Sequence, residues 1–363
     1  MIRDKSLVGI ALWSLALGTI TSPAASPPQR IECVAGCGST DDRTAAGARL
    51  VQPFGVAFDR HGNWYICEYQ GQRITRIDKR GNLSLFAGSD GKSGAVEGLR
   101  AGEIRFHDPH GLVISREKMY VADTLNHRVI EIELGTGRAA ALAGTGQAGY
   151  SGDDGPAAGA TFNQLYAVDL DKKGESLYLT DLRNRRIRLL SLKSGIVRTI
   201  AGNGVEGIPA DGALATASPL LDPRAAVVDS KGNLYILERR GNALRVVDKT
   251  GRIRTVIGPG INRSPQNSTT GAIGELNGPK HLSVDRDDNV IIADTENHRI
   301  LKYNPKESST VVIAGTGEKG NRLVQDAPLK TELNRPHGVF THSSGALFIS
   351  DSENNRVLKL SAP

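Results

Sequence analysis

Short apolar runs recur along the chain and alternate with polar turns. In one stretch, residues 55–58 are small or apolar, residues 59–63 read Asp-Arg-His-Gly-Asn, and residues 64–66 are apolar again. Asp, Gly and Asn accept positive backbone φ, so this pattern predicts two antiparallel strands joined by a hairpin turn. A third strand begins near an Arg, as at residues 128–130, and a fourth ends in Ala-Gly, as at residues 143–144. The pattern therefore predicts a unit of four antiparallel strands.

This unit occurs six times, at spacings of 56 to 58 residues. The repeats begin at Leu50, Phe106, Phe162, Leu220, Leu276 and Leu333. Six four-stranded units predict an all-β fold, a six-bladed β-propeller of antiparallel blades. A linear solenoid is the alternative, but it would need atypical capping repeats at both ends.

The two ends of the chain favour a closed ring over a solenoid. The sixth unit stops after its third strand, residues 356–360, while residues 31–36 match the fourth strand of the third unit, residues 197–202. We expect the N-terminal strand to complete the last blade, because this removes the unpaired edge of an open ring.

The turns after the second strands carry a recognisable motif. Residues 123–128 and 294–299 resemble the core of the NHL repeat, residues 351–356 are close to it, and residues 181–186 are weaker. Blades one and four depart from it. The resemblance covers residues 31–363 and implies a fold rather than a function. Because the Asp and Arg of the motif recur in several blades, we interpret them as structural, with the Asp accepting hydrogen bonds from the following turn and pairing with the Arg.

The N-terminus is typical of a secretory signal peptide. Arg3 and Lys5 precede a mostly apolar stretch at residues 7–20. Residues 22–24, Ser-Pro-Ala, then supply the small side chains of a cleavage site. The stretch is too short for a spanning helix, which needs about 20 residues. We expect a signal peptide at residues 1–24, a propeller at residues 25–363, a periplasmic or secreted location, and no membrane insertion once the signal is removed.

Composition and charge add two expectations. The 42 glycines suit many tight turns, and the net charge of +6 comes from basic residues scattered through the blades. Export and scattered charge argue against a nucleic-acid partner. Export also permits a disulfide. Cys33 and Cys37 could pair by turning at Gly36 and Gly38, whereas an extended strand would hold their sulfurs apart, so the sequence leaves this pairing open.

A binding site is expected on the face where the long loops between the fourth and first strands emerge. The loops and the turns after the second strands reach this face, which also holds the mouth of the central channel. The residue after the first-strand Pro, or its equivalent, should point into that mouth. This ring is Phe54, His110, Tyr166, Arg224, Lys280 and His337. We expect it to bind an anionic group of a protein, peptide or glycan partner, with Arg224 as a bidentate clamp, on a monomeric binding or scaffold module.

An enzyme is the alternative. The Pro-His-Gly steps at His110 and His337 resemble those of the peptidyl-hydroxyglycine amidating lyase, which implies a metal-dependent lyase or hydrolase with zinc held by three histidines on alternate blades. Here Arg224 takes the third place, which leaves two nitrogen ligands where catalytic zinc needs three protein ligands. Tyr166 would then be the general base and Arg224 the charge stabiliser.

Carboxylates in the long loops are candidate calcium ligands. Asp41, Asp42, Asp153, Asp154 and Asp211 lie in matching Gly-rich loops, but none has the spacing of a known calcium loop. Solvated turns are the simpler interpretation, and we expect no cofactor.

Overall fold

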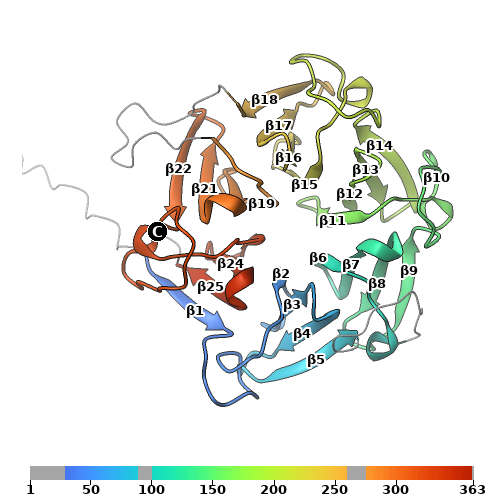
Figure 1. Ribbon diagram of the computed structural model, residues 1–363. Helices are drawn as coiled ribbons and strands as arrows, with labels where there is room; N and C mark the ends of the chain where they lie inside the picture. The colour runs from blue at the N-terminus through green and yellow to red at the C-terminus, as the bar shows by residue number, and fades with distance from the viewer. Residues whose placement is uncertain (1–28, 89–99, 260–274, 362–363) are drawn as a thin grey trace, which may run out of the picture.

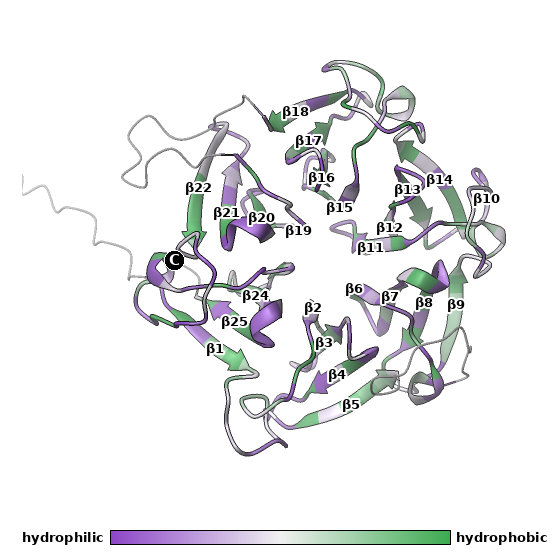
Figure 2. Cartoon of the chain, viewed as in Figure 1, coloured by the Kyte–Doolittle hydropathy of each residue, from purple (hydrophilic) through white to green (hydrophobic). Residues whose placement is uncertain are grey.

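The apolar runs of the six repeat units form strands that assemble into six antiparallel sheets around a central axis (Figure 1). The fold comes from a computed structural model that describes residues 29–88, 100–259 and 275–361. The predicted signal peptide lies outside the described residues. Figure 2 shows hydrophobic residues concentrated along the strands and hydrophilic ones at the turns. The prediction of an all-β, six-bladed propeller is confirmed.

The first three blades follow the order of the sequence. Blade one contains β2 (Pro53–Phe58), β3 (Trp64–Glu68), β4 (Arg73–Ile77) and β5 (Leu83–Gly88). Blade two contains β6 (Pro109–Ser115), β7 (Lys118–Asp123), β8 (Arg128–Glu133) and β9 (Ala139–Ala143). Blade three contains β11 (Leu165–Leu170), β12 (Ser176–Asp181), β13 (Arg186–Ser191) and β14 (Ile196–Ala201), with β10 (Gly155–Pro156) added at its outer edge.

The last three blades repeat this plan. Blade four contains β15 (Pro223–Val228), β16 (Leu234–Glu238), β17 (Ala243–Val247) and β18 (Ile253–Ile257). Blade five contains β19 (His281–Val284), β20 (Val290–Asp294), β21 (Arg299–Asn304) and β22 (Ser309–Ala314). Blade six contains β23 (Gly338–Thr341), β24 (Leu347–Asp351), β25 (Arg356–Leu360) and β1 (Ile31–Ala35).

Short 3-10 turns connect the strands on one face. They are η1 (Ala101–Glu103), η2 (Thr124–Asn126), η3 (Ala157–Gly159), η4 (Ala215–Ala217), η5 (Thr295–Asn297), η6 (Pro328–Lys330) and η7 (Ser352–Asn354). No helix in the described ranges is long and apolar enough to cross a membrane.

The ring closes where β1 pairs with β25. Ile31 lies opposite Leu360 and Cys33 opposite Leu358, and the Ser361 N–H donates to the Arg30 carbonyl at 2.8 Å. Figure 1 shows this blue N-terminal strand beside the red C-terminal one. The predicted completion of the last blade is confirmed.

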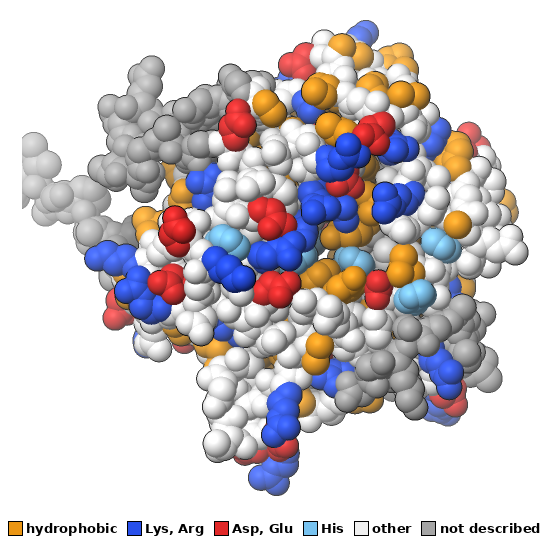
Figure 3. Space-filling model, in the orientation of Figure 1, with side chains coloured by type: hydrophobic (Ala, Val, Ile, Leu, Met, Phe, Trp, Pro, Cys, Tyr) orange, Lys and Arg blue, Asp and Glu red, His pale blue; other side chains and the backbone are white. Residues whose placement is uncertain are grey.

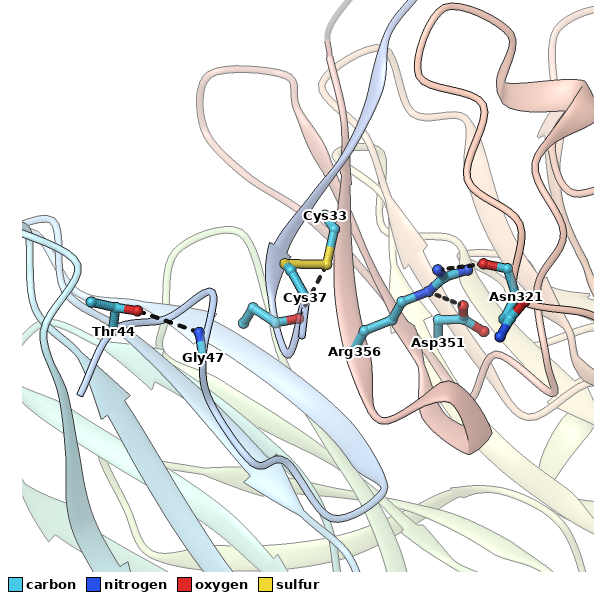
Figure 4. The surroundings of a disulfide bond; sticks show 8 residues. Cys33, Cys37, Thr44, Gly47, Asn321, Asp351 and Arg356 are labelled. Carbon is cyan, nitrogen blue, oxygen red and sulfur yellow. Dashed lines mark hydrogen bonds and ion pairs between the residues drawn. A yellow bond between two sulfur atoms is a disulfide. The ribbon is translucent and has the colours of Figure 1, made fainter. Parts of the chain in front are cut away.

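A disulfide fastens the turn that leaves β1. Cys33 and Cys37 are bonded, with 5.8 Å between their Cα atoms (Figure 4). The chain can turn between them because Gly36 has a φ of 68°, and a Cβ there would collide with the carbonyl oxygen of Asn355. Cys67 is buried and free. The structure thus answers the pairing left open by the sequence.

The first residue of each repeat packs between two neighbouring blades. Leu50, Phe106, Phe162, Leu220, Leu276 and Leu333 are all buried. Phe106, for example, belongs to a cluster with Cys67 and Ile74 of blade one and Val121 of blade two. The residues that define the repeat spacing in the sequence are therefore the ones that fill the core between neighbouring blades.

The recurring Asp-Arg pair is structural, and the Asp also accepts a backbone hydrogen bond from the loop ahead of the first strand. Asp123 is buried and receives the Arg128 Nε–H at 2.9 Å. It also accepts the backbone N–H of His107 at 2.8 Å, in the segment that enters the first strand. Asp294 does the same with Arg299 and the Asn277 N–H. Each Asp also accepts a bond from the following turn, as expected, because the side-chain amides of Asn126 and Asn297 donate to Asp123 and Asp294 at 2.9 Å. The structure adds a link that was not expected, from the second strand back to the loop ahead of the first.

Candidate functional site

A repeated backbone irregularity sets the direction of the ring side chains. In blades one to four the strand register shifts at the ring residue, so Phe54, His110, Tyr166 and Arg224 each occupy a β-bulge at the start of the first strand. Such a bulge re-aims a side chain. In blades five and six, Lys280 and His337 stand immediately before β19 and β23. All six residues therefore lie at one end of the innermost strands.

The six ring residues meet around the axis. The Phe54 ring stacks on His337 with centroids 4.1 Å apart and meets the edge of His110 at 5.3 Å. His110 lies 4.2 Å from Tyr166, and the Arg224 guanidinium carbon lies 4.6 Å from the centroid of the Tyr166 ring. Lys280 Nζ is 2.7 Å from His337 Nε2. Five of the six neighbouring pairs are thus in contact.

Charged residues of both signs surround this ring. Arg224 pairs with Asp222 at 3.1 Å, and Lys280 Nζ lies 3.8 Å from Glu296. Arg335 pairs with Glu296 at 2.8 Å from the next blade. Figure 3 shows Lys and Arg side chains gathered around the centre of the ring, interleaved with acidic ones. The Arg224 guanidinium is already paired with the Asp222 carboxylate. A ligand anion would have to compete with this carboxylate to bind Arg224.

Two guanidinium groups at the mouth nevertheless keep unused donors. Within the described residues, Arg224 Nε and Arg335 Nε are buried and have no hydrogen-bond partner. A buried N–H without a partner costs free energy, about 1–3 kcal/mol, more for a charged group. An anionic or polar ligand could relieve this cost if the side chain turned its Nε–H toward the mouth.

Both ring histidines are held neutral. The Nδ1–H of His110 donates to the Asp108 carbonyl at 2.7 Å, and that of His337 donates to the Arg335 carbonyl at 3.0 Å. A carbonyl only accepts, so each Nε2 keeps its lone pair. Burial, then the charges of Arg224 and Lys280, lower the pKa of His110 to about 3. Burial, with Lys280 nearby, holds the pKa of His337 well below its usual value.

The same surroundings shift the other titratable ring residues. Burial is the main cause that lowers the pKa of Lys280 to about 7, aided by Arg335, Arg239 and Arg224 and opposed by Glu296. Burial raises the pKa of Tyr166 despite the neighbouring Arg224. A phenol with a raised pKa stays protonated, which makes Tyr166 a poor general base for the lyase alternative.

Zinc or calcium would need several ligand side chains placed close together. Over residues 29–88, 100–259 and 275–361, His, Cys, Asp and Glu do not gather in groups of three or more that could hold a metal ion. His281 faces away from the ring, with its imidazole 4.8 Å from the Phe340 ring. Asp153 is more than a solvated turn, because it accepts bonds from Tyr150, Thr199 and Arg188 and pins its loop to blade three.

Several residues at the mouth escaped the sequence reasoning. Arg335 and Asp222 stand two residues before a ring residue, and both have positive φ, of 48° and 57°. Glu296 comes from the turn after a second strand, and Tyr69 stacks on Phe54 with centroids 4.6 Å apart. The available signal was the repeat alignment, which shows that the position two before each ring residue also differs between blades.

The opposite end of the channel holds a second feature that the sequence did not predict. A cavity of about 430 Å³ is lined there by the far ends of first strands, including Val56, Leu112, Phe340 and Asp169. Asp169 is enclosed by protein but keeps part of its surface open to this cavity. Burial raises its pKa to about 7.

Comparison with known sequences gives a consistent set of relatives. Residues 158–362 match the Teneurin NHL domain. The chain is 24% identical over 319 residues to NHL repeat-containing protein 2 of Homo sapiens, an alignment that covers 78% of this chain and 43% of that protein. It is 27% identical over 281 residues to Protein SUPPRESSOR OF QUENCHING 1, chloroplastic, of Arabidopsis thaliana, covering 74% and 26% respectively. The chain thus spans less than half the length of these curated relatives.

Solved structures share the fold at low identity. An auxiliary nutrient binding protein from Bacteroides thetaiotaomicron superposes with a TM-score of 0.63 at 14% identity, over 93% of this chain and 77% of that one. Catalytically inactive virginiamycin B lyase from Staphylococcus aureus, solved with quinupristin, gives a TM-score of 0.52 at 14% identity, over 92% and 100%. At this identity the likeness concerns the fold alone.

Proposed function

The chain belongs to the family of NHL-repeat β-propellers, and from this premise we propose that it is an exported binding module whose channel mouth takes an anionic group of a protein, peptide or glycan partner. The observation that carries the proposal is the pair of unused, buried guanidinium donors of Arg224 and Arg335 beside the ring. Guanidinium is suited to carboxylate and phosphate because its N–H groups form a planar fork.

The remaining surroundings support recognition of more than a bare ion. Phe54, Tyr69, His110 and Tyr166 form a continuous aromatic wall beside the cations. Such a wall can bury the apolar or sugar-ring part of a ligand while polar groups fix its orientation. The Cys33–Cys37 disulfide supports a location outside the cytoplasm, where such bonds persist. We propose a monomer that acts in the periplasm or extracellular space without a nucleic-acid partner.

Binding can be tested with probes of defined charge. Acidic peptides and carboxylated or sulfated glycans, each with a neutral analogue, would be screened against the protein and titrated by calorimetry. We expect the combined change of Arg224, Lys280 and His337 to Ala to weaken binding of the selected acidic probe at least tenfold, since a charge-assisted hydrogen bond contributes about 1.5–3 kcal/mol. Arg198→Gln, at an exposed position of β14, is the matched control and should bind like the parent.

Asp222 provides an independent check of the same idea. Asp222→Asn removes the carboxylate that competes for Arg224 and should tighten binding of the acidic probe severalfold. Circular dichroism would verify the fold of each variant. Undiminished binding by the triple variant, or a loss equal to that of Arg198→Gln, would overturn the proposal.

A further inference from the structure

We propose that Lys280 is a nucleophilic amine, with His337 as its base, and that it captures the carbonyl carbon of an anionic aldehyde or ketone as an imine. This inference rests on the proposed function in one respect: the anionic group is held by the same channel mouth. It goes beyond binding, because it assigns a covalent step to the site.

Three groups in sequence carry the inference. Lys280 Nζ lies 2.7 Å from His337 Nε2, and His337 Nδ1 lies 3.0 Å from the Arg335 carbonyl oxygen. The carbonyl fixes the imidazole tautomer, so Nε2 presents a lone pair to the amine. A nucleophile within hydrogen-bond reach of a base, and a base oriented by a third group, is the general arrangement of an activated nucleophile.

Packing holds this arrangement in one geometry. The His337 ring is stacked on Phe54 with an interplanar angle of 10°, and His337 is buried. The Lys280 side chain is 9% exposed, so the amine is largely desolvated. Burial lowers the pKa of Lys280 to about 7, which leaves a large neutral fraction at neutral pH. A neutral amine is the form that attacks a carbonyl.

The neighbouring charges suit the ligand class. Three cationic side chains lower the pKa of Lys280: Arg224 and Arg239 from blade four and Arg335 from blade six. Glu296, from the same blade as Lys280, raises this pKa. The cations can hold a carboxylate or phosphate next to the reacting carbonyl. The Phe54 ring stacks on His337, and the Tyr166 ring lies against the Arg224 guanidinium.

The step balances without a further reactant. The Lys280 nitrogen lone pair forms a bond to the carbonyl carbon, and the carbonyl π electrons move to oxygen. His337 Nε2 takes one proton from the attached nitrogen and passes it to this oxygen, which gives a neutral carbinolamine. Transfer of the second nitrogen proton to the hydroxyl by the same route releases water and leaves a carbon–nitrogen double bond. Water hydrolyses the imine by the reverse path.

The amine can be tested first with a small uncharged carbonyl. The full-length mature protein would be treated with formaldehyde and cyanoborohydride across a pH series, and methylation of each lysine followed by peptide mass spectrometry. At pH 7 we expect Lys280 to react at least tenfold faster than the exposed Lys193 and Lys249, with a half-maximal rate near pH 7. Restricted access scales the rate equally at every pH, so the midpoint remains informative.

Variants around the amine separate a reactive site from a structural lysine. Glu296→Gln should move the midpoint to lower pH, because the carboxylate that favours the ammonium is lost. His337→Asn should slow imine formation with pyridoxal at least fivefold. A Lys280 midpoint above about pH 9, or methylation of Lys280 only after denaturation, would overturn the inference.

A pair of aldehydes distinguishes this inference from the proposed function. Pyridoxal and pyridoxal 5′-phosphate differ in one phosphate, and borohydride traps either imine on Lys280. Trapping of both at equal rates would support the amine chemistry and contradict anion recognition. Calorimetric binding of inorganic phosphate without any trapped imine would support the anion site and defeat the nucleophile. Faster trapping of the phosphate form supports both.

Discussion

The imidazole Nδ1 of His298 accepts a hydrogen bond from the backbone N–H of Arg335 at 3.0 Å, across the junction of blades five and six. Both residues have positive φ. The same link joins His127 to Gln164, Gln72 to Asp108, Asn242 to Gly278 and Asn355 to Gln52. At five of the six junctions, the residue that ends the turn after the second strand therefore accepts a hydrogen bond from the next blade. The donor is the backbone N–H of the residue two positions before the ring residue. At the junction of blades three and four, Arg185 takes this place and has no acceptor atom.

This link predicts the effect of changes at His298. His298→Ala should lower the free energy of unfolding by about 1–3 kcal/mol, because the Arg335 N–H loses its partner. His298→Asn should cost much less, since Asn tolerates positive φ and already makes this link at two junctions. Equilibrium denaturation in urea would measure both, and equal losses in the two variants would contradict the role of the acceptor.

The junction of blades three and four, which lacks this hydrogen bond, predicts a variant of higher stability. Arg185→Asn should raise the free energy of unfolding by about 1 kcal/mol if the new amide oxygen accepts a bond from the entering backbone. The loss of the exposed Arg185–Glu206 ion pair should offset little of this. Arg183→Asn, two residues away in the same turn, is the control and should bring no gain in the same urea titration.

The disulfide next to the closing strand predicts a redox-dependent stability. Replacing Cys33 and Cys37 by Ser should lower the unfolding free energy by about 2 kcal/mol, the loop-closure value for so short a loop. A reductant should destabilise the parent by a similar amount and leave the double variant unchanged. If the reductant affected both proteins equally, another thiol-dependent process would be responsible.

Asp169 predicts a pH-dependent penalty. Its folded pKa of about 7 lies above the unfolded value near 3.9, so ionising it costs stability as the pH rises through this window and costs nothing below it. Asp169→Asn should therefore raise Tm most above pH 7, with the gain vanishing near pH 4. Asp171→Asn, in the adjacent turn, is the matched control for thermal melts at the same pH values. A gain that did not vary with pH would contradict the explanation.

Metal content separates the binding module from the zinc-dependent alternative. We expect protein purified without chelators to contain well under one equivalent of zinc or calcium by elemental analysis. Only two ring histidines offer nitrogen ligands, fewer than the three protein ligands of catalytic zinc. One equivalent of zinc, lost in His110→Ala, would favour the lyase. The parent protein should also keep its Tm in EDTA.

The sequence by itself determined the architecture of this protein. Repeat spacing, turn composition and the match of residues 31–36 to a fourth strand were sufficient to predict six blades and the pairing of β1 with β25. These features are local or periodic, since each repeat must bury the same face against its neighbour. The same alignment picked out six residues of five types for the channel mouth, and the structure brings them together.

Only the tertiary structure decided how those residues are used. It paired Arg224 with Asp222, placed Lys280 against His337, and set Asp169 beside a cavity at the far end of the channel. Bonds such as that from Arg335 to Glu296 join different blades, and their partners lie 39 residues apart. Charge state and orientation depend on burial and on neighbours across the axis, which no periodic pattern along one chain specifies. The repeat therefore fixes where side chains stand, and the closed ring fixes their chemistry.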